Sequence, residues 1–81
     1  MMTSLPLLPM RLLPAGSTAR VAELLGDIHQ VHRLEELGLR RGTQIRMLSP
    51  GSPCIVHLEG SRLCFRDSDL LGVMVTQEDV A

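Results

Sequence analysis

The stretch DIHQVHRLEELGLRRG, residues 27–42, predicts one helix followed by the start of a strand. Asp27 stands three residues before Gln30, a variant of the capping-box pattern found where helices begin. Apolar residues then recur at helical spacing, at Ile28, Val31, Leu34 and Leu37. Gly38 supplies the left-handed residue that commonly ends a helix. A helix of about three turns with one apolar face is therefore expected after Asp27.

Short strands are expected on both sides of this helix. In the first strand Ala19 and Val21 alternate with polar neighbours, and in the second Ile45 and Met47 do the same. The strands are expected at residues 17–25, 43–49, 54–59, 62–66 and 72–76. Alternation of this kind is typical of strands with one buried face. We therefore expect a sheet that wraps around a core.

A β-hairpin is the expected link between residues 54–59 and 62–66, because Gly60-Ser61 suits a two-residue type II′ turn. This turn pairs Glu59 with Arg62 and places His57 opposite Cys64 on the outer side. The same register predicts an inner face of Cys54, Val56, Leu58, Leu63 and Phe65.

The two ends of the chain are expected to differ from the central domain, residues 15–77. Residues 1–14 carry three prolines among leucines and predict an extended arm, of which Leu12 and Leu13 pack on the domain. Residues 67–71 predict a one-turn helix capped by Asp67, and residues 78–81 are expected to fray. The expected fold class is mainly β: a small, strongly bent barrel of about five strands, with one helix after the first strand and a helical turn before the last.

Composition limits the classes of partner. Apolar residues make up 44% of the 81-residue chain and charged residues 21%, which is typical of one globular domain. The chain has eight arginines and nine acidic residues, and no basic stripe is evident in the sequence. Nucleic acid is therefore not an expected partner. One Phe and no Tyr or Trp cannot build the aromatic groove that binds proline-rich peptides.

The cellular setting is expected to be the cytoplasm. Two cysteines do not make a disulfide framework, and no export signal precedes the domain. The apolar runs are far shorter than the roughly 20 residues that cross a bilayer, so no direct membrane insertion is expected. Any membrane system would be served from outside the bilayer.

The run RLEELGLRRG, residues 33–42, resembles the signature of FeoA-domain proteins. Upstream, residues 13–21 look like that family's entry turn and first strand, and residues 60–66 resemble its hairpin. The resemblance covers about residues 10–76 and implies an SH3-like barrel. It also implies a cytoplasmic accessory protein of bacterial ferrous iron transport, which binds the GTPase-linked ferrous iron permease at the inner membrane. No cofactor is expected. The proline- and leucine-rich start is longer than the family's usual approach to its first strand.

Two other functions are carried as alternatives. Similar barrels form the C-terminal module of metal-dependent transcriptional repressors, so the chain could regulate through a DNA-binding partner, although no DNA-reading helices are evident. A small metal carrier is the second alternative. An enzyme is not expected, because the chain lacks a recognisable Ser, His and acid constellation and a P-loop.

The candidate site residues are few. Leu39, Arg40 and Arg41 follow the helix as an apolar residue beside two guanidinium donors, a combination typical of protein recognition, with the alternative that Leu39 is tucked inward. No metal site is expected. The candidates considered for one are His29, His32 and Glu36 on the helix, and His57 with Cys64 across the hairpin.

Overall fold

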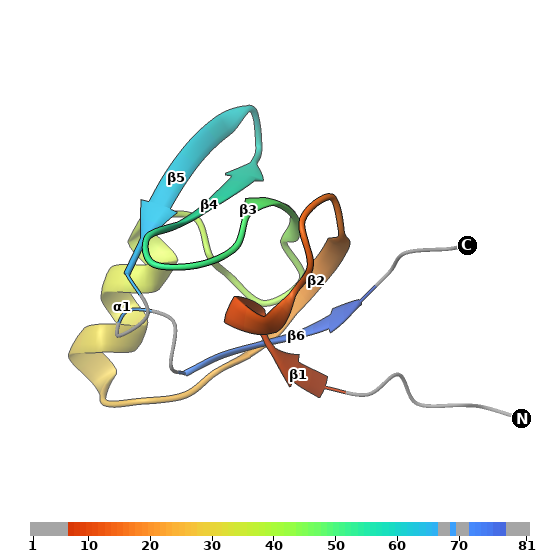
Figure 1. The fold of residues 1–81 in the computed structure, drawn as a ribbon. Helices are drawn as coiled ribbons and strands as arrows, with labels where there is room; N and C mark the ends of the chain where they lie inside the picture. The colour runs from red at the N-terminus through yellow and green to blue at the C-terminus, as the bar shows by residue number, and fades with distance from the viewer. Residues whose placement is uncertain (1–6, 67–68, 70–71, 78–81) are drawn as a thin grey trace, which may run out of the picture.

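The protein is described by a computed structural model that places residues 7–66, 69 and 72–77 (Figure 1). Within these residues, the helix α1 (Ile28–Glu36) and a 3-10 helix (Met10–Leu12) accompany a β-sheet. The strands are β1 (Leu7–Pro9), β2 (Thr18–Leu24), β3 (Gln44–Ser49), β4 (Cys54–Leu58), β5 (Ser61–Phe65) and β6 (Val73–Gln77).

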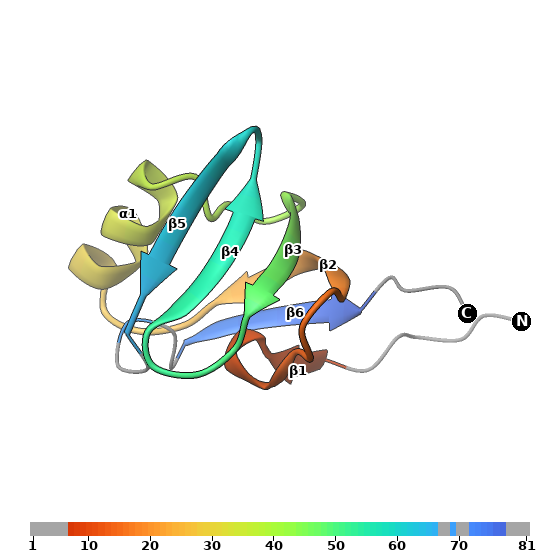
Figure 2. The ribbon, with the colours of Figure 1, turned by 45° about the horizontal axis from the view of Figure 1, so that its top comes forward.

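All six strands belong to one antiparallel sheet with the order β1-β6-β2-β3-β4-β5. In Figure 2, β3, β4 and β5 stand above β2, β6 and β1, and α1 lies beside the β5 end. Bulges between Val21 and Glu23 and between Met47 and Ser49 allow the sheet to bend. The predicted fold class is confirmed, with β1 as an additional strand. Within the described residues β1 and β5 are the edges, so no hydrogen bonds close the sheet into a ring.

The core fills the concave side of the bent sheet. The predicted inward residues Ala19, Val21, Ile45 and Met47 are all buried, as is Cys54. Val73 and Val75 of the last strand complete this apolar layer. Alternating burial along β2, β3 and β4 thus confirms the strand assignments that the sequence pattern favoured.

Part of the N-terminal segment expected as an arm is built into the sheet. Leu7–Pro9 pairs with β6, which places Pro9 on an edge strand where its missing N–H costs nothing. Met10 in the 3-10 helix that follows is buried, as is Leu13 directly after it, but Leu12 is 58% exposed, so the prediction for Leu12 was wrong. Positions three apart eclipse in a 3-10 turn, which explains why Met10 and Leu13 share the buried side.

The helix predicted from the opening stretch is confirmed. The Asp27 carboxylate accepts a hydrogen bond from the Gln30 amide at 2.9 Å, and Gly38 adopts a φ of 107° after the last turn. The predicted apolar face is only partly buried: Leu34 is 3% exposed, whereas Ile28 is 78% exposed. The helix covers one end of the sheet instead of lying along it, so its first turn contributes little to the core.

The hairpin joins β4 and β5 in a different register from the predicted one. Glu59 and Gly60 are the turn residues, both with positive φ (48° and 82°), which describes a type I′ turn in place of type II′. His57 therefore faces Arg62, not Cys64. The correction leaves the inner face intact, because a shift of two residues preserves which side chains point inward.

The predicted one-turn helix at residues 67–71 lies largely outside the described residues, as do residues 78–81. No helix in the described part of the chain is long and apolar enough to span a membrane.

Candidate protein-interaction surfaces

The corner between α1 and β3 holds the three residues considered for partner recognition. Leu39 is 0% exposed and lies in the core, so the inward alternative describes its position. Arg40 and Arg41 are exposed. The guanidinium of Arg40 donates from Nε to the Glu35 carbonyl at 3.2 Å, which ties this side chain to the end of the helix. Of the three residues, only Arg40 and Arg41 are therefore exposed at the corner.

Backbone hydrogen bonds hold this corner in one shape. The Gly42 amide donates to the Val21 carbonyl at 2.7 Å, and the Val21 amide donates to the Thr43 carbonyl at 2.9 Å. Arg20 of β2 adds a side-chain bond from NH1 to the Gly42 carbonyl at 2.9 Å. Because three bonds attach the corner to β2, its arginines project from a rigid support, which lowers the entropy lost on binding.

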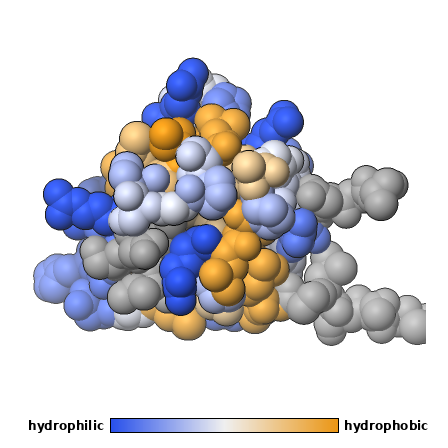
Figure 3. Space-filling model, viewed as in Figure 1, coloured by the Kyte–Doolittle hydropathy of each residue, from blue (hydrophilic) through white to orange (hydrophobic). Residues whose placement is uncertain are grey.

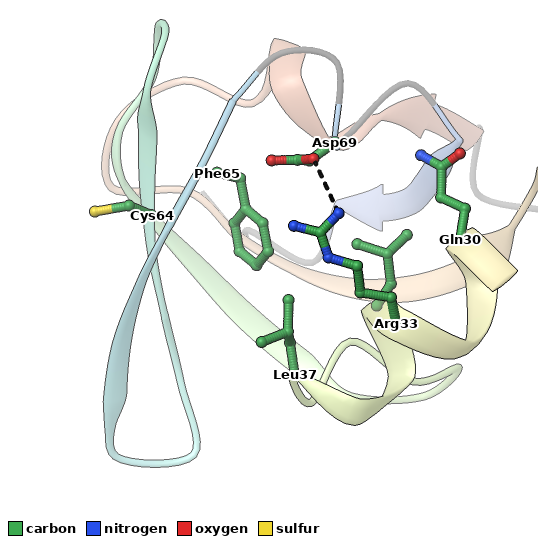
Figure 4. A pocket seen from close by; sticks show the side chains of 7 residues that line it. Gln30, Arg33, Leu37, Cys64, Phe65 and Asp69 are labelled. Atoms are coloured by element: carbon green, nitrogen blue, oxygen red, sulfur yellow. Dashed lines mark ion pairs between the residues drawn. The ribbon is translucent and has the colours of Figure 1, made fainter.

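A pocket of about 60 Å³ lies between α1 and β5 (Figure 4). Its floor is apolar, formed by Leu34 and Phe65, each 3% exposed, with Leu37 beside them. Arg33 and Asp69 form its polar rim as an ion pair at 4.0 Å. An apolar floor under a polar rim is the usual anatomy of a small recognition pocket, and this one has room for one side-chain tip.

Exposed leucines lie beside the pocket and in the N-terminal part of the described chain. Leu37, 44% exposed, stands at the helix end over the pocket. Leu7 and Leu12, 50% and 58% exposed, lie in β1 and the 3-10 helix. Figure 3 shows an apolar patch over that second region. Exposed leucines are common singly on soluble proteins, but Leu37 also adjoins a pocket.

The histidines of α1 lie on its solvent side. His32 Nδ1 is 3.7 Å from Glu36 Oε2, an i,i+4 pair in which both side chains are 68% exposed. His29 is exposed one turn earlier. Among the residues described, no three His, Cys, Asp or Glu side chains are placed to hold a metal ion together. The exposed pair has the features of a solvated helix face.

The observed register also separates the other metal candidates. His57 is opposite Arg62, and Cys64 is opposite Ile55, so the direct His57–Cys64 pair expected from the sequence is not formed. Both side chains are exposed on the outer side of the sheet. Figure 4 shows the Cys64 side chain pointing away from the pocket, while Phe65 points into it.

The pocket was not predicted from the sequence. Its walls come from the helix and from β5, which are about 30 residues apart in the chain. The one available signal was the inward assignment of Phe65 together with the apolar face that carries Leu34 and Leu37. That signal predicts burial, but it contains no information on how closely the helix approaches the strand.

Comparison with known proteins shows what this chain resembles. The model of the FeoA domain matches residues 8–77. No curated protein matches the sequence significantly. A crystal structure of an iron uptake regulatory protein, FeoA, is 24% identical and has a TM-score of 0.85, covering 90% of this chain and 100% of that one.

Two further structures extend the comparison. Stenotrophomonas maltophilia FeoA in complex with zinc, described as an SH3 domain protein, is 27% identical with a TM-score of 0.76; the match covers 91% of this chain and 99% of that one. T. acidophilum IdeR is 22% identical with a TM-score of 0.83, and the match covers 96% of this chain but 37% of IdeR. The bent sheet with one helix is therefore an SH3-like architecture found both alone and as part of a longer chain.

Proposed function

Because this chain belongs to the FeoA-domain family, we propose that it is an accessory protein of bacterial ferrous iron uptake that binds the cytoplasmic part of the GTPase-linked ferrous iron permease. The observation that carries the proposal is the FeoA-domain match over residues 8–77, which includes every strand except the first residue of β1. The S. maltophilia relative has been suggested as an activating factor of ferrous iron transport. In this proposal the protein acts in the cytoplasm, by contact, without catalysing a reaction.

The surfaces described above support a role in protein binding. Arg40 and Arg41 supply guanidinium donors on a rigid corner, and Arg is enriched where proteins recognise each other. The pocket beside Leu37 offers an apolar anchor point a few residues away in the chain. A partner with one protruding apolar side chain next to carboxylates would satisfy both features.

A transport assay tests this function directly. Ferrous iron uptake under anaerobic limitation is measured in a strain whose gene has been deleted and then restored with variants. Deletion should lower uptake, and the wild-type protein should restore it. The double variant Arg40→Ala, Arg41→Ala should restore it poorly, whereas Arg11→Ala, which removes an exposed arginine from the 3-10 helix, should restore it fully. Unchanged uptake after deletion would contradict the proposal.

A second candidate function rests on the similarity in fold to IdeR. The chain would then contact a DNA-binding regulator and alter transcription, as a separate module of the kind that such repressors carry within one chain. Affinity capture from the native cells distinguishes the two functions. Recovery of a metal-dependent regulator without the permease would favour this second candidate over the first.

A further inference from the structure

The outer face of β2–β5 carries a row of basic side chains that the register of the sheet assembles. Arg46 of β3 faces Thr18 on one side and His57 on the other, and His57 in turn faces Arg62 of β5. Because residues opposite each other on neighbouring strands share a face, these side chains form one line across four strands. Arg46, His57 and Arg62 are all exposed, whereas their neighbours in sequence Met47, Val56 and Leu58 are buried.

This row continues toward the arginine corner. Arg20 lies on the same face of β2, opposite Gln44, and its guanidinium donates to the Gly42 carbonyl beside Arg41. Neighbouring strands are about 4.8 Å apart, so the row from Thr18 to Arg62 spans roughly 14 Å. We call Arg46, His57 and Arg62 the basic row.

Few of the carboxylates that the structure describes lie along the basic row. Of the acidic residues that the structure describes, Glu59 alone lines the groove of about 350 Å³ that holds Arg46, His57 and Gln44. No ion pair joins Arg46 or Arg62 to a carboxylate within residues 7–66, 69 and 72–77. Although the chain has a net charge of −1, this face is locally positive.

An apolar row lies beside the basic one. Ile55 faces Cys64 of β5 and Ser49 of β3, and Leu48, 39% exposed, is the bulged residue directly before Ser49. Arginines beside apolar side chains are typical of protein interfaces. Binding to single-stranded nucleic acid depends instead on exposed aromatic rings, and the one aromatic residue, Phe65, is buried. The composition of the face therefore favours a protein partner.

We propose that the outer face of β2–β5 is a docking surface for an acidic segment of a protein partner, with carboxylates on the basic row and apolar side chains on Leu48, Ile55 and Cys64. An extended segment places alternate side chains on one side about 6.7 Å apart, which allows two carboxylates to reach guanidiniums that lie two strands apart. The inference rests on the proposed function in taking the partner to be a protein. It goes further by adding a contact face that continues from the arginine corner, and by stating the chemistry of the segment that this face binds.

Two probes test the docking surface: the cytoplasmic GTPase domain of the permease, and a synthetic ten-residue peptide of six Glu followed by four Leu, in which each side of the extended chain carries both residue types. The test variant is Arg46→Ala with Arg62→Ala, and the control is Arg11→Glu on the 3-10 helix. Both change the net charge from −1 to −3, the first by removing two positive charges and the second by replacing one positive charge with a negative one. A difference between them therefore reports position and not total charge.

Affinity for each probe is measured at low and high salt, together with the alkylation rate of Cys64, whose exposed thiol belongs to the proposed face. We expect the test variant to bind about tenfold or more weakly, from the loss of charge-assisted hydrogen bonds, and the control to bind within about twofold of wild type. Bound partner should slow Cys64 alkylation, and added salt should weaken binding.

The outcomes separate the two proposals. Permease binding that is equal in wild type and test variant, with Cys64 unprotected, overturns the docking surface and leaves the proposed function standing. Binding of the peptide at this face without any binding of the permease domain overturns the proposed function and supports the surface. Binding of neither probe overturns both. Tighter binding of single-stranded RNA or of phosphatidylserine vesicles through Arg46 and Arg62 would overturn the assignment to a protein.

Discussion

The backbones of Leu25 and Gly72 lie directly against each other where β2 ends and β6 begins. The Leu25 amide donates to the Gly72 carbonyl at 2.7 Å, and a Cβ atom at position 72 would overlap the Leu25 carbonyl oxygen. The overlap involves backbone on both sides, so no side-chain rotation can relieve it. Glycine is required here for close approach, which places it among the residues that hold β2 and β6 together.

Gly72→Ala should therefore destabilise the protein by about 2–3 kcal/mol, because backbone must shift to accommodate the methyl group. Chemical denaturation monitored by circular dichroism measures the change. Gly16→Ala is the matched control. A Cβ atom at position 16 would have nothing within 4 Å, but the backbone there has a φ of 87°, which is unfavourable for alanine. The unfolding free energy of that variant should fall by only about 1 kcal/mol, which is the cost of a positive φ for alanine. Equal losses in the two variants would contradict the close approach.

The two leucines around Gly38 should respond differently to truncation. Leu39→Ala removes a fully buried side chain and should cost about 2–5 kcal/mol of unfolding free energy. Leu37→Ala removes a side chain that is 44% exposed and should cost about 1 kcal/mol or less. Urea denaturation of the pair measures both values. A larger loss of unfolding free energy for Leu37→Ala than for Leu39→Ala would contradict the burial of Leu39 and the exposure of Leu37.

The hairpin turn offers a substitution that stabilises. Glu59 has a φ of 48°, which is unfavourable for most side chains, whereas Asn tolerates it and Asn-Gly is the preferred type I′ pair. Glu59→Asn should raise the unfolding free energy by about 0.5–1 kcal/mol. Glu59→Ala, which removes the charge but keeps the unfavourable φ, should bring no such gain. A thermal melt in which Asn and Ala behave alike would favour the type II′ register instead.

The two cysteines should differ in reactivity. Cys54 is buried in the core and Cys64 is exposed, so a thiol reagent such as 5,5′-dithiobis(2-nitrobenzoate) should modify one thiol in the native protein and two after denaturation. Cys64→Ser should abolish the native reaction, and Cys54→Ser should leave it unchanged. If two thiols reacted rapidly in the native protein, β4 would have to open readily or Cys54 would have to lie nearer the surface.

Local patterns in the sequence predicted the elements well where the cause was local. The helix begins at the Asp27 cap and ends before Gly38, because both signals act within a few residues of the helix ends. Alternating burial along β2, β3 and β4 followed the alternation of residue types. The register of the hairpin was wrong because Gly60 suits the first position of one turn type and the second of another, and both place the same side chains inward.

By itself the amino-acid sequence determined the fold class, the helix with both of its ends, and the inner face of four of the five predicted strands. These features depend on capping, turn residues and hydrophobic period, all of which act between near neighbours. Tertiary structure decided that Leu39 is buried while Leu37 is exposed, that residues 7–9 join the sheet, and that α1 and β5 enclose a pocket. It also brought Arg20, Arg46, His57 and Arg62 onto one face, because pairing of distant strands depends on how the whole sheet bends around its core.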